Sequence, residues 1–214
     1  MVYRIFLVED HPVMLEGFAR MLDSEPDVEV CGQARSGTEA LRAIAEAKPD
    51  LALVDLSIPD MNGLDVIKQL RTLDPQLATL VVTAHSEALY GERALRAGAK
   101  GFISKDASSD AILDAIRTVL RGDRYLSPAL RDHVEEQAAN GQDEASPLTI
   151  LSDRELEVFE HFGRGYSTVK TAEALFISPK TVETHRANIK RKLGLERANE
   201  VIQRATLWVE SLRD

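Results

Sequence analysis

Two patterns of hydrophobic and polar residues divide the chain, and the first covers residues 3–121. There, short apolar runs typical of buried strands alternate with segments in which apolar residues recur every three or four positions, as along one side of a helix. The predicted strands are residues 3–8, 28–34, 51–54, 77–83 and 101–104. The predicted helices are residues 13–22, 38–47, 64–73, 88–97 and 111–120. Strict alternation of this kind predicts an α/β fold, with a five-stranded parallel sheet and helices on both of its faces.

The second pattern is purely helical and follows a stretch of small and polar residues at 122–148, which contains a polar helix-like segment. Such a composition predicts a linker. Beyond it, Ser152 and Glu155 have the spacing of a capping box, and Ser178 followed by Pro179 is a helix-start signal. The predicted helices are residues 153–163, 168–175, 179–193 and 198–212. We therefore expect three parts: a domain at residues 1–121, a linker at 122–148 and a small all-α domain at 149–214.

Charge is distributed unevenly between these parts. The whole chain carries a formal net charge of −9, which on its own argues against a nucleic-acid partner. Residues 1–148 hold 15 Lys and Arg against 25 Asp and Glu, a net of −10, whereas residues 149–214 hold 11 against 10, a net of +1. Because the acidity belongs to the first two-thirds, the helical domain remains a candidate for DNA binding.

Other classes of protein are excluded more directly. Cys31 is the only cysteine, so an intramolecular disulfide or a cysteine-cluster zinc site is impossible. The first apolar run is shorter than that of a signal peptide, and no run reaches the ~20 apolar residues needed to cross a membrane. We expect a cytoplasmic protein with no membrane partner.

Chemically active side chains stand at the ends of four predicted strands. Glu9 and Asp10 follow the first strand, Asp55 follows the third, Thr83 closes the fourth and Lys105 follows the fifth. Any one of these could simply mark a turn, but all five lie at the carboxyl ends, where open parallel sheets bind ligands. Three close carboxylates repel one another and need a cation, for which Mg²⁺ is the natural choice. With Mg²⁺ bound, Asp55 can attack a phosphoryl group whose oxygens are held by Lys105 and Thr83.

Residues 3–121 resemble the receiver domain of bacterial two-component response regulators, which has a flavodoxin-like fold. Four segments match its motifs in order: VEDHP at 8–12, LVDLSIPDMNG at 53–63, VTA at 82–84 and FISK at 102–105. The resemblance implies that Asp55 is the phosphoacceptor and that Mg²⁺ is bound by Glu9, Asp10, Asp55 and the Ser57 backbone carbonyl. It also implies two switch positions, Thr83, which follows the phosphoryl group, and Phe102, which rotates inward behind it. Many receivers have Tyr where Phe102 stands, so the inward position must rest on packing alone here.

Enzymatic alternatives fit the residues less well. Phosphatases of the haloacid dehalogenase type also use a strand-end Asp with Mg²⁺, but they need a second Asp two residues later, where Ser57 stands here. A dinucleotide site would need a Gly-x-Gly-x-x-Gly motif after the first strand, and the sequence has none there. We therefore expect no enzyme beyond self-phosphorylation and slow autodephosphorylation at Asp55. A receiver that acts by protein contact without phosphorylation remains the alternative.

The second and third predicted helices of the C-terminal domain have the proportions of a helix-turn-helix. Val182, Ile189 and Leu193 form one apolar stripe on the third helix. Five Lys or Arg lie within residues 180–192, against the single acid Glu183, which favours a DNA-binding face over a merely solvated one. The candidate DNA-binding residues are Lys180, Thr181, Glu183, Thr184, Arg186, Ala187, Asn188, Lys190 and Arg191.

The segments LSDRELEV at 151–158 and ISPKTVETHRANIKRKLG at 177–194 closely resemble the LuxR-type DNA-binding domain. With the receiver, this indicates a response regulator of the NarL/FixJ type. The resemblance implies base contacts at Glu183, Thr184 and Ala187. Thr171 departs from the family, which usually has Ile there, and weakens the expected core. His185 has no partner for a metal site and is expected to pack or to contact phosphate.

The fourth helix has a partly apolar side that includes Val201, Ala205, Trp208 and Val209. The resemblance makes this a dimerisation helix that matches two-fold DNA half-sites, while ordinary packing on the neighbouring helices is the alternative. The combined hypothesis is a transcription regulator whose partner histidine kinase phosphorylates Asp55 with Mg²⁺. Its other expected partners are double-stranded promoter DNA and a second copy of the chain.

Overall fold

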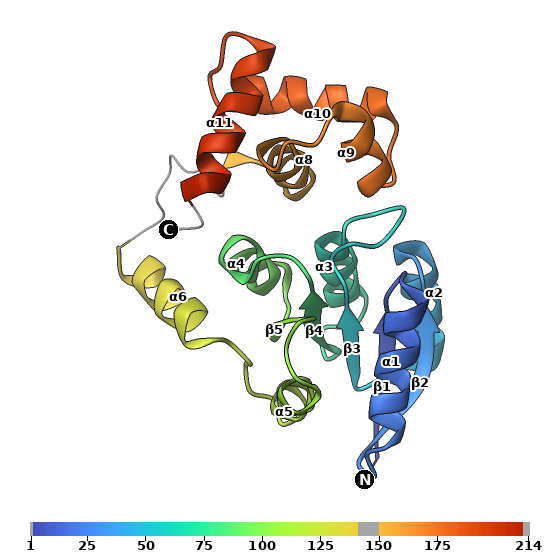
Figure 1. Cartoon of the computed structure of the whole chain (residues 1–214). Coiled ribbons are helices and arrows are strands. Elements are labelled where there is room, and N and C mark those ends of the chain that lie inside the picture. Colours follow the sequence, from blue (N-terminus) through green and yellow to red (C-terminus); the bar gives the residue numbers. More distant parts are fainter. Residues whose placement is uncertain (1, 141–149, 212–214) are drawn as a thin grey trace. The chain divides into compact units, whose positions relative to one another are not determined.

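The computed structural model describes residues 2–140 and 150–211, which form two compact units, Met1–Ala139 and Asn140–Asp214 (Figure 1). The first unit contains a five-stranded parallel sheet in the order β2-β1-β3-β4-β5. Its strands are β1 (Tyr3–Val8), β2 (Val28–Ala34), β3 (Leu51–Val54), β4 (Ala78–Thr83) and β5 (Gly101–Ser104). This confirms the predicted fold class, with one strand boundary moved by one residue.

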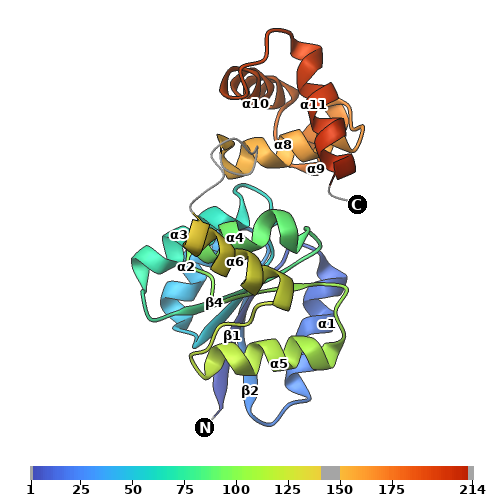
Figure 2. The ribbon, with the colours of Figure 1, turned by 90° about the vertical axis from the view of Figure 1, so that its left-hand side faces the viewer.

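Helices cover both faces of this sheet because the inner strands β1, β3 and β4 bury residues on both of their sides. They are α1 (Pro12–Asp23), α2 (Gly37–Ala47), α3 (Gly63–Leu73), α4 (Glu87–Ala97) and α5 (Ser109–Leu120). Leu15 and Phe18 of α1 share one core cluster with Ile112 and Ile116 of α5, so these two helices pack on the same face. Helix α3 contacts both α2 and α4 and belongs to the opposite layer, as the view in Figure 2 shows.

The strand order brings the predicted functional positions to one edge of the sheet. Strands β1, β3, β4 and β5 are consecutive neighbours, with Val8 paired to Val54 and Thr83 paired to Ser104. Since all the strands are parallel, their carboxyl ends lie along the same edge. The predicted site requires these four strands to lie side by side, and the observed strand order has them so.

The stretch expected as a linker has structure in its described part. Tyr125 pairs with Gly101 along the free edge of β5, and helix α6 (Pro128–Asn140) follows. The first unit therefore extends past residue 121 to Ala139. The remainder of the expected linker, 141–148, lies outside the described residues.

The second unit is a small bundle of α8 (Asp153–Gly163), α9 (Thr168–Ala174), α10 (Pro179–Lys192) and α11 (Ala198–Ser211). The predicted capping box is present, because the Ser152 side chain accepts from the Glu155 backbone and the Glu155 side chain accepts from the Ser152 backbone. Phe159 and Phe162 of α8 supply the largest buried side chains of this unit. Thr171 of α9 is fully buried and its hydroxyl has no hydrogen-bond partner among the described residues. The apolar residue expected at that place is replaced by an unpaired polar group.

Candidate functional site

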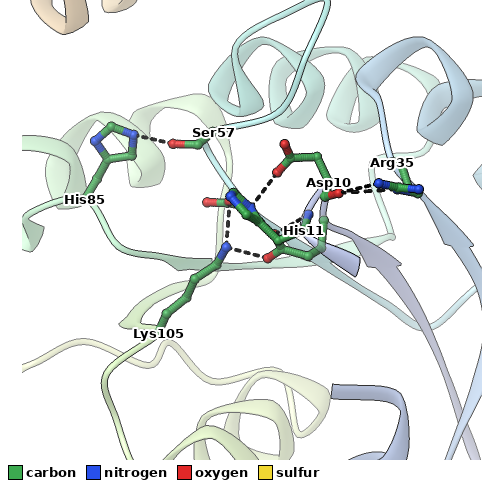
Figure 3. A network of polar contacts seen from close by, with 8 residues as sticks. Asp10, His11, Arg35, Ser57, His85 and Lys105 are labelled. Carbon is green, nitrogen blue, oxygen red and sulfur yellow. Dashed lines mark hydrogen bonds and ion pairs between the residues drawn. The ribbon is translucent and has the colours of Figure 1, made fainter. Parts of the chain in front are cut away.

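A buried acidic cluster lies at the carboxyl ends of β1 and β3 (Figure 3). Glu9 and Asp10 follow β1, and Asp55 follows β3. Glu9 is 2% exposed and Asp55 is 3% exposed. Carboxylate oxygens of all three, together with a ring nitrogen of His11, lie within 4.8 Å of one another. Ionised carboxylates at this spacing and burial need nearby positive charge.

Lys105 supplies part of that charge. Its Nζ donates to Asp55 Oδ2 at 2.8 Å and also forms an ion pair with Glu9 Oε2 (Figure 3). Burial of the ammonium opposes its charge, but the two carboxylates outweigh burial, so the pKa of Lys105 lies above the ordinary lysine value. The lysine therefore remains charged and holds the acceptor carboxylate in place.

The charge of Lys105 leaves part of the cluster unsatisfied. Asp55 Oδ1 is buried and has no hydrogen-bond partner among the described residues. A buried oxygen of this kind is costly unless something coordinates it. Hard oxygen ligands from Glu9, Asp10 and Asp55 are those that Mg²⁺ prefers. The residues present therefore fit a divalent cation.

Two residues that the sequence did not single out complete the surroundings of the cluster. His11 Nδ1 lies 3.0 Å from Glu9 Oε1 and 2.8 Å from Asp10 Oδ1. Arg35, which follows β2, donates from Nη2 to the Asp10 backbone carbonyl at 3.0 Å. Both contacts depend on the path of the loops after β1 and β2, and no residue spacing indicates such a path.

The loop after Asp55 is tied to the end of β4. Ser57 Oγ lies 2.8 Å from His85 Nε2, so the side chain of Ser57 is engaged outside the acidic cluster (Figure 3). The start of α3 also approaches closely, because a Cβ atom on Gly63 would lie 2.2 Å from the Asp55 carbonyl oxygen. Only glycine allows α3 to begin this near the candidate phosphoacceptor.

The two expected switch residues are both buried. Thr83 is 0% exposed and its Oγ1 accepts a hydrogen bond from the His85 backbone at 3.4 Å. Phe102 is 1% exposed, so its ring already lies inward in this structure. The inward position rests on packing, as the absence of a tyrosine hydroxyl requires.

Helix α10 presents the candidate DNA-binding face. Val182 and Ile189 are fully buried against the rest of the unit, and the opposite side is exposed or half-buried. Glu183 Oε1 accepts from Thr168 Oγ1 at 2.8 Å and pairs with Arg186 at 3.2 Å. Glu183 therefore joins α9 to α10 while it remains half-exposed, beside positions expected to contact bases.

Two buried carboxylates of α8 pair with basic side chains, one on α10 and one on α8 itself. Lys192 at the end of α10 pairs with Glu155 at 2.7 Å. Glu157 is 1% exposed and pairs with Arg154 at 2.7 Å, and Arg154 also donates to the Leu175 carbonyl. Burial, opposed by Arg154, raises the pKa of Glu157 to about 7.

His185 is half-buried and its Nδ1 has no hydrogen-bond partner among the described residues. Burial lowers the pKa of His185, and the charge of Arg154 lowers it further. Within the described chain, the one cluster of potential metal ligands is the acidic cluster of the first unit, which does not include His185.

The residues expected at a dimer interface pack within the second unit. Val201 and Ala205 are fully buried, and Trp208 packs on Phe159 of α8 with ring centroids 5.4 Å apart. Val209 is 8% exposed and would collide with a Cβ on Gly163 of α8. The large apolar side chains that α11 exposes are Ile202 and Leu207, at 41% and 63%.

Comparison with known proteins decides the family. Residues 5–117 match the family model described as response regulator receiver domain, and residues 149–205 match the model described as bacterial regulatory proteins, luxR family. The chain is a response regulator. This response regulator is 36% identical over 208 residues to the oxygen regulatory protein NreC of Staphylococcus carnosus strain TM300, an alignment that covers 94% of this chain and 96% of that protein. It is 38% identical over 208 residues to NreC of Staphylococcus aureus strain NCTC 8325 / PS 47, with the same coverage.

Solved structures support the same assignment. The LuxR-family response regulator from Aurantimonas sp. SI85-9A1 matches with a TM-score of 0.60 at 30% identity, over 65% of this response regulator and 100% of that chain. RcsB from Salmonella enterica serovar Typhimurium, solved bound to promoter rprA in the presence of the phosphomimetic BeF3−, matches in fold with a TM-score of 0.63 at 22% identity. That match covers 96% of this response regulator and 99% of RcsB.

These findings confirm the predicted family and function. This response regulator is a DNA-binding transcriptional regulator of a two-component system, and its family consists of transcription factors rather than enzymes. Across residues 2–140 and 150–211, every helix is too short or too polar to cross a membrane.

Proposed function

We propose that Asp55 accepts a phosphoryl group from a partner histidine kinase. The observation that carries this proposal is the buried Asp55 carboxylate, with one oxygen held by Lys105 and the other without a hydrogen-bond partner. The unpaired oxygen is the available nucleophile. As it attacks, a new P–O bond forms on Asp55 while the bond from phosphorus to the kinase histidine breaks. Lys105 and the Thr83 hydroxyl then bind the transferred oxygens.

Mg²⁺ is the cofactor of this proposal, held by Glu9, Asp10, Asp55 and the Ser57 backbone carbonyl. When bound, it neutralises the charge that accumulates between the carboxylates and the phosphoryl oxygens. A hard cation prefers the carboxylate oxygens of Glu9 and Asp10 to the ring nitrogen of His11. His11 therefore contributes as a hydrogen-bond partner of these two carboxylates and not as a ligand. Phosphorylation acts through Thr83 and Phe102, the two switch positions.

The DNA-binding part of the proposal assigns base and phosphate contacts to α10. Glu183, Thr184 and Ala187 face the bases, and the basic side chains of the same helix bind phosphates. The chain binds as a homodimer through α11. Because Val201, Ala205, Trp208 and Val209 pack within the unit, the exposed Ile202 and Leu207 of the same helix form the contact surface.

The decisive experiment measures covalent phosphate after incubation with Mg²⁺ and acetyl phosphate, a small phosphodonor. We expect incorporation in the wild type and none in Asp55→Asn. Asp65→Asn is the matched control, because Asp65 is a half-exposed carboxylate on α3 that pairs with Lys68 at 3.0 Å and does not belong to the acidic cluster. Unchanged incorporation in Asp55→Asn would refute the assignment of the phosphoacceptor. If the wild type shows no incorporation and no response to Mg²⁺ with beryllofluoride, the receiver acts by protein contact alone.

A further inference from the structure

The segment that leaves α5 is attached to the free edge of β5. The Tyr125 backbone N–H donates to the Lys100 carbonyl at 3.0 Å, and the Phe102 N–H donates to the Tyr125 carbonyl at 3.2 Å. A Cβ atom on Gly101 would lie 2.8 Å from that same carbonyl oxygen. The chain therefore runs against the backbone of Phe102, one of the two proposed switch residues.

Helix α6 then touches α4 through one side chain, in the region where Figure 2 shows the two helices together. Leu130 is 5% exposed and, among the α6 side chains that the structure describes, it alone is buried. A Cβ atom on Gly91 of α4 would lie 2.8 and 2.9 Å from the two Leu130 methyl carbons. A cavity of about 340 Å³, lined by Glu87, Ala88, Ala129 and Leu130, lies beside this contact. Among the described side chains of α6, Leu130 is thus the buried contact with α4, and it lies next to open space.

A chain of contacts joins this point to the other switch residue. The Thr83 hydroxyl accepts from the His85 backbone, and the His85 ring packs on the Tyr90 ring with centroids 4.6 Å apart. Tyr90 is fully buried and immediately precedes Gly91 on α4. These contacts connect Thr83 to the surface on which Leu130 sits.

We propose that residues 122–135, the α6 strap, are docked on the receiver until Asp55 is phosphorylated and are then released. This inference rests on the proposed function. The strap is bound to the backbone of β5 at Phe102 and to α4 at Gly91, and the contacts of Thr83 lead to the α4 site. Among the described side chains, Leu130 alone is buried in its attachment to α4, and a small difference in affinity between the two states is enough to shift such an equilibrium. Release would free the segment that precedes the DNA-binding unit.

Hydrogen–deuterium exchange of the full chain tests this proposal, with Mg²⁺ and beryllofluoride as the phosphoryl analogue. In the wild type, the analogue is expected to accelerate exchange in α6. Gly91→Ala should accelerate it without the analogue, by about tenfold, because the new methyl displaces Leu130 and most of the burial of a leucine is lost. The substitution favours helix α4 itself, so the fold is retained. Gly17→Ala is the matched control, since nothing lies within 4 Å of a Cβ on Gly17 in α1.

Leu130→Ala provides a second test of the same contact, because it removes the side chain without altering α4. Faster α6 exchange in both variants, but not in Gly17→Ala, supports the strap. If the analogue changes exchange around Thr83 but leaves α6 unchanged, the strap is refuted and the proposed function stands. If the analogue changes no amide at all, the proposed function fails and the strap fails with it. If α6 exchanges at the wild-type rate in both Gly91→Ala and Leu130→Ala, the contact between Leu130 and Gly91 does not hold the strap, and the proposal is overturned.

Discussion

The unpaired hydroxyl of Thr171 makes the second unit less stable than its packing allows. The side chain is 0% exposed, and Oγ1 has no hydrogen-bond partner among the described residues. Burying a hydroxyl without a partner costs about 1–3 kcal/mol. Thr171→Val keeps the volume and the branched shape while it replaces that hydroxyl with a methyl group. We expect the free energy of unfolding of this unit to rise by about 1–2 kcal/mol.

Urea titration of the full chain, followed by tryptophan fluorescence, measures this effect selectively. Trp208 is the only tryptophan and packs on Phe159, so its emission reports on the second unit. At a slope of about 1 kcal/mol per M for a small domain, the midpoint should rise by about 1 M or more.

Thr206→Val is the matched control, because the Thr206 hydroxyl donates to the Ile202 carbonyl at 3.0 Å and leaves no unpaired group to remove. Its midpoint should stay unchanged or fall. A fall in the midpoint of Thr171→Val would show that the Thr171 hydroxyl is satisfied in solution, and the reasoning from burial would be wrong.

Three further predictions concern charge. Glu157 has a pKa of about 7 when folded against 4.5 in its ordinary state, so the folded unit binds the proton more tightly. The stability that this group contributes is present below pH 4.5 and is lost as the pH rises through 7, a loss of about 3 kcal/mol in the free energy of unfolding. In urea titrations at a series of pH values, Glu157→Gln should remove most of this pH dependence. Lys105→Met leaves Glu9 and Asp55 buried without their ammonium, so we expect the free energy of unfolding of the first unit to fall by about 3–5 kcal/mol and to be partly restored by Mg²⁺. Equal urea midpoints of this variant with and without Mg²⁺ would contradict the cation site. Finally, the fragment 149–214 should bind promoter DNA more tightly than the unphosphorylated full chain, because it lacks the segment 1–148 with its net charge of −10. Fluorescence anisotropy titrations compare the two affinities, and equal or weaker binding by the fragment would refute an inhibitory role of the acidic segment.

Much of the fold and of the acidic site could be predicted because they depend on short-range patterns. Buried parallel strands are continuous apolar runs, and the residues that follow them reach the same edge whatever the loops do. For this reason Glu9, Asp55 and Lys105 are found together as expected. The capping box and the helix-start signals are equally local, and they place the helices within a few residues.

The features that escaped prediction depend on tertiary contacts between distant segments. The apolar side of α11 was compatible with either a dimer or internal packing, and only the position of α8 shows that Ala205 and Trp208 are used internally. The contact of Leu130 with Gly91 joins α6 to α4, and no pattern in the sequence relates these two helices. Arg35, which follows β2, donates to the Asp10 backbone carbonyl after β1, and no residue spacing relates these two loops.

The contacts of Glu183 have a consequence for redesigning promoter choice. One carboxylate oxygen accepts from Thr168 of α9 and pairs with Arg186 of α10, so the residue ties the two helices together in addition to its proposed base contact. A substitution there removes the contact between α9 and α10 and frees an arginine on the proposed DNA-binding face in the same step. Transplanting the residue found at this position in another regulator would therefore not transfer its base preference unless the partners at 168 and 186 were exchanged with it.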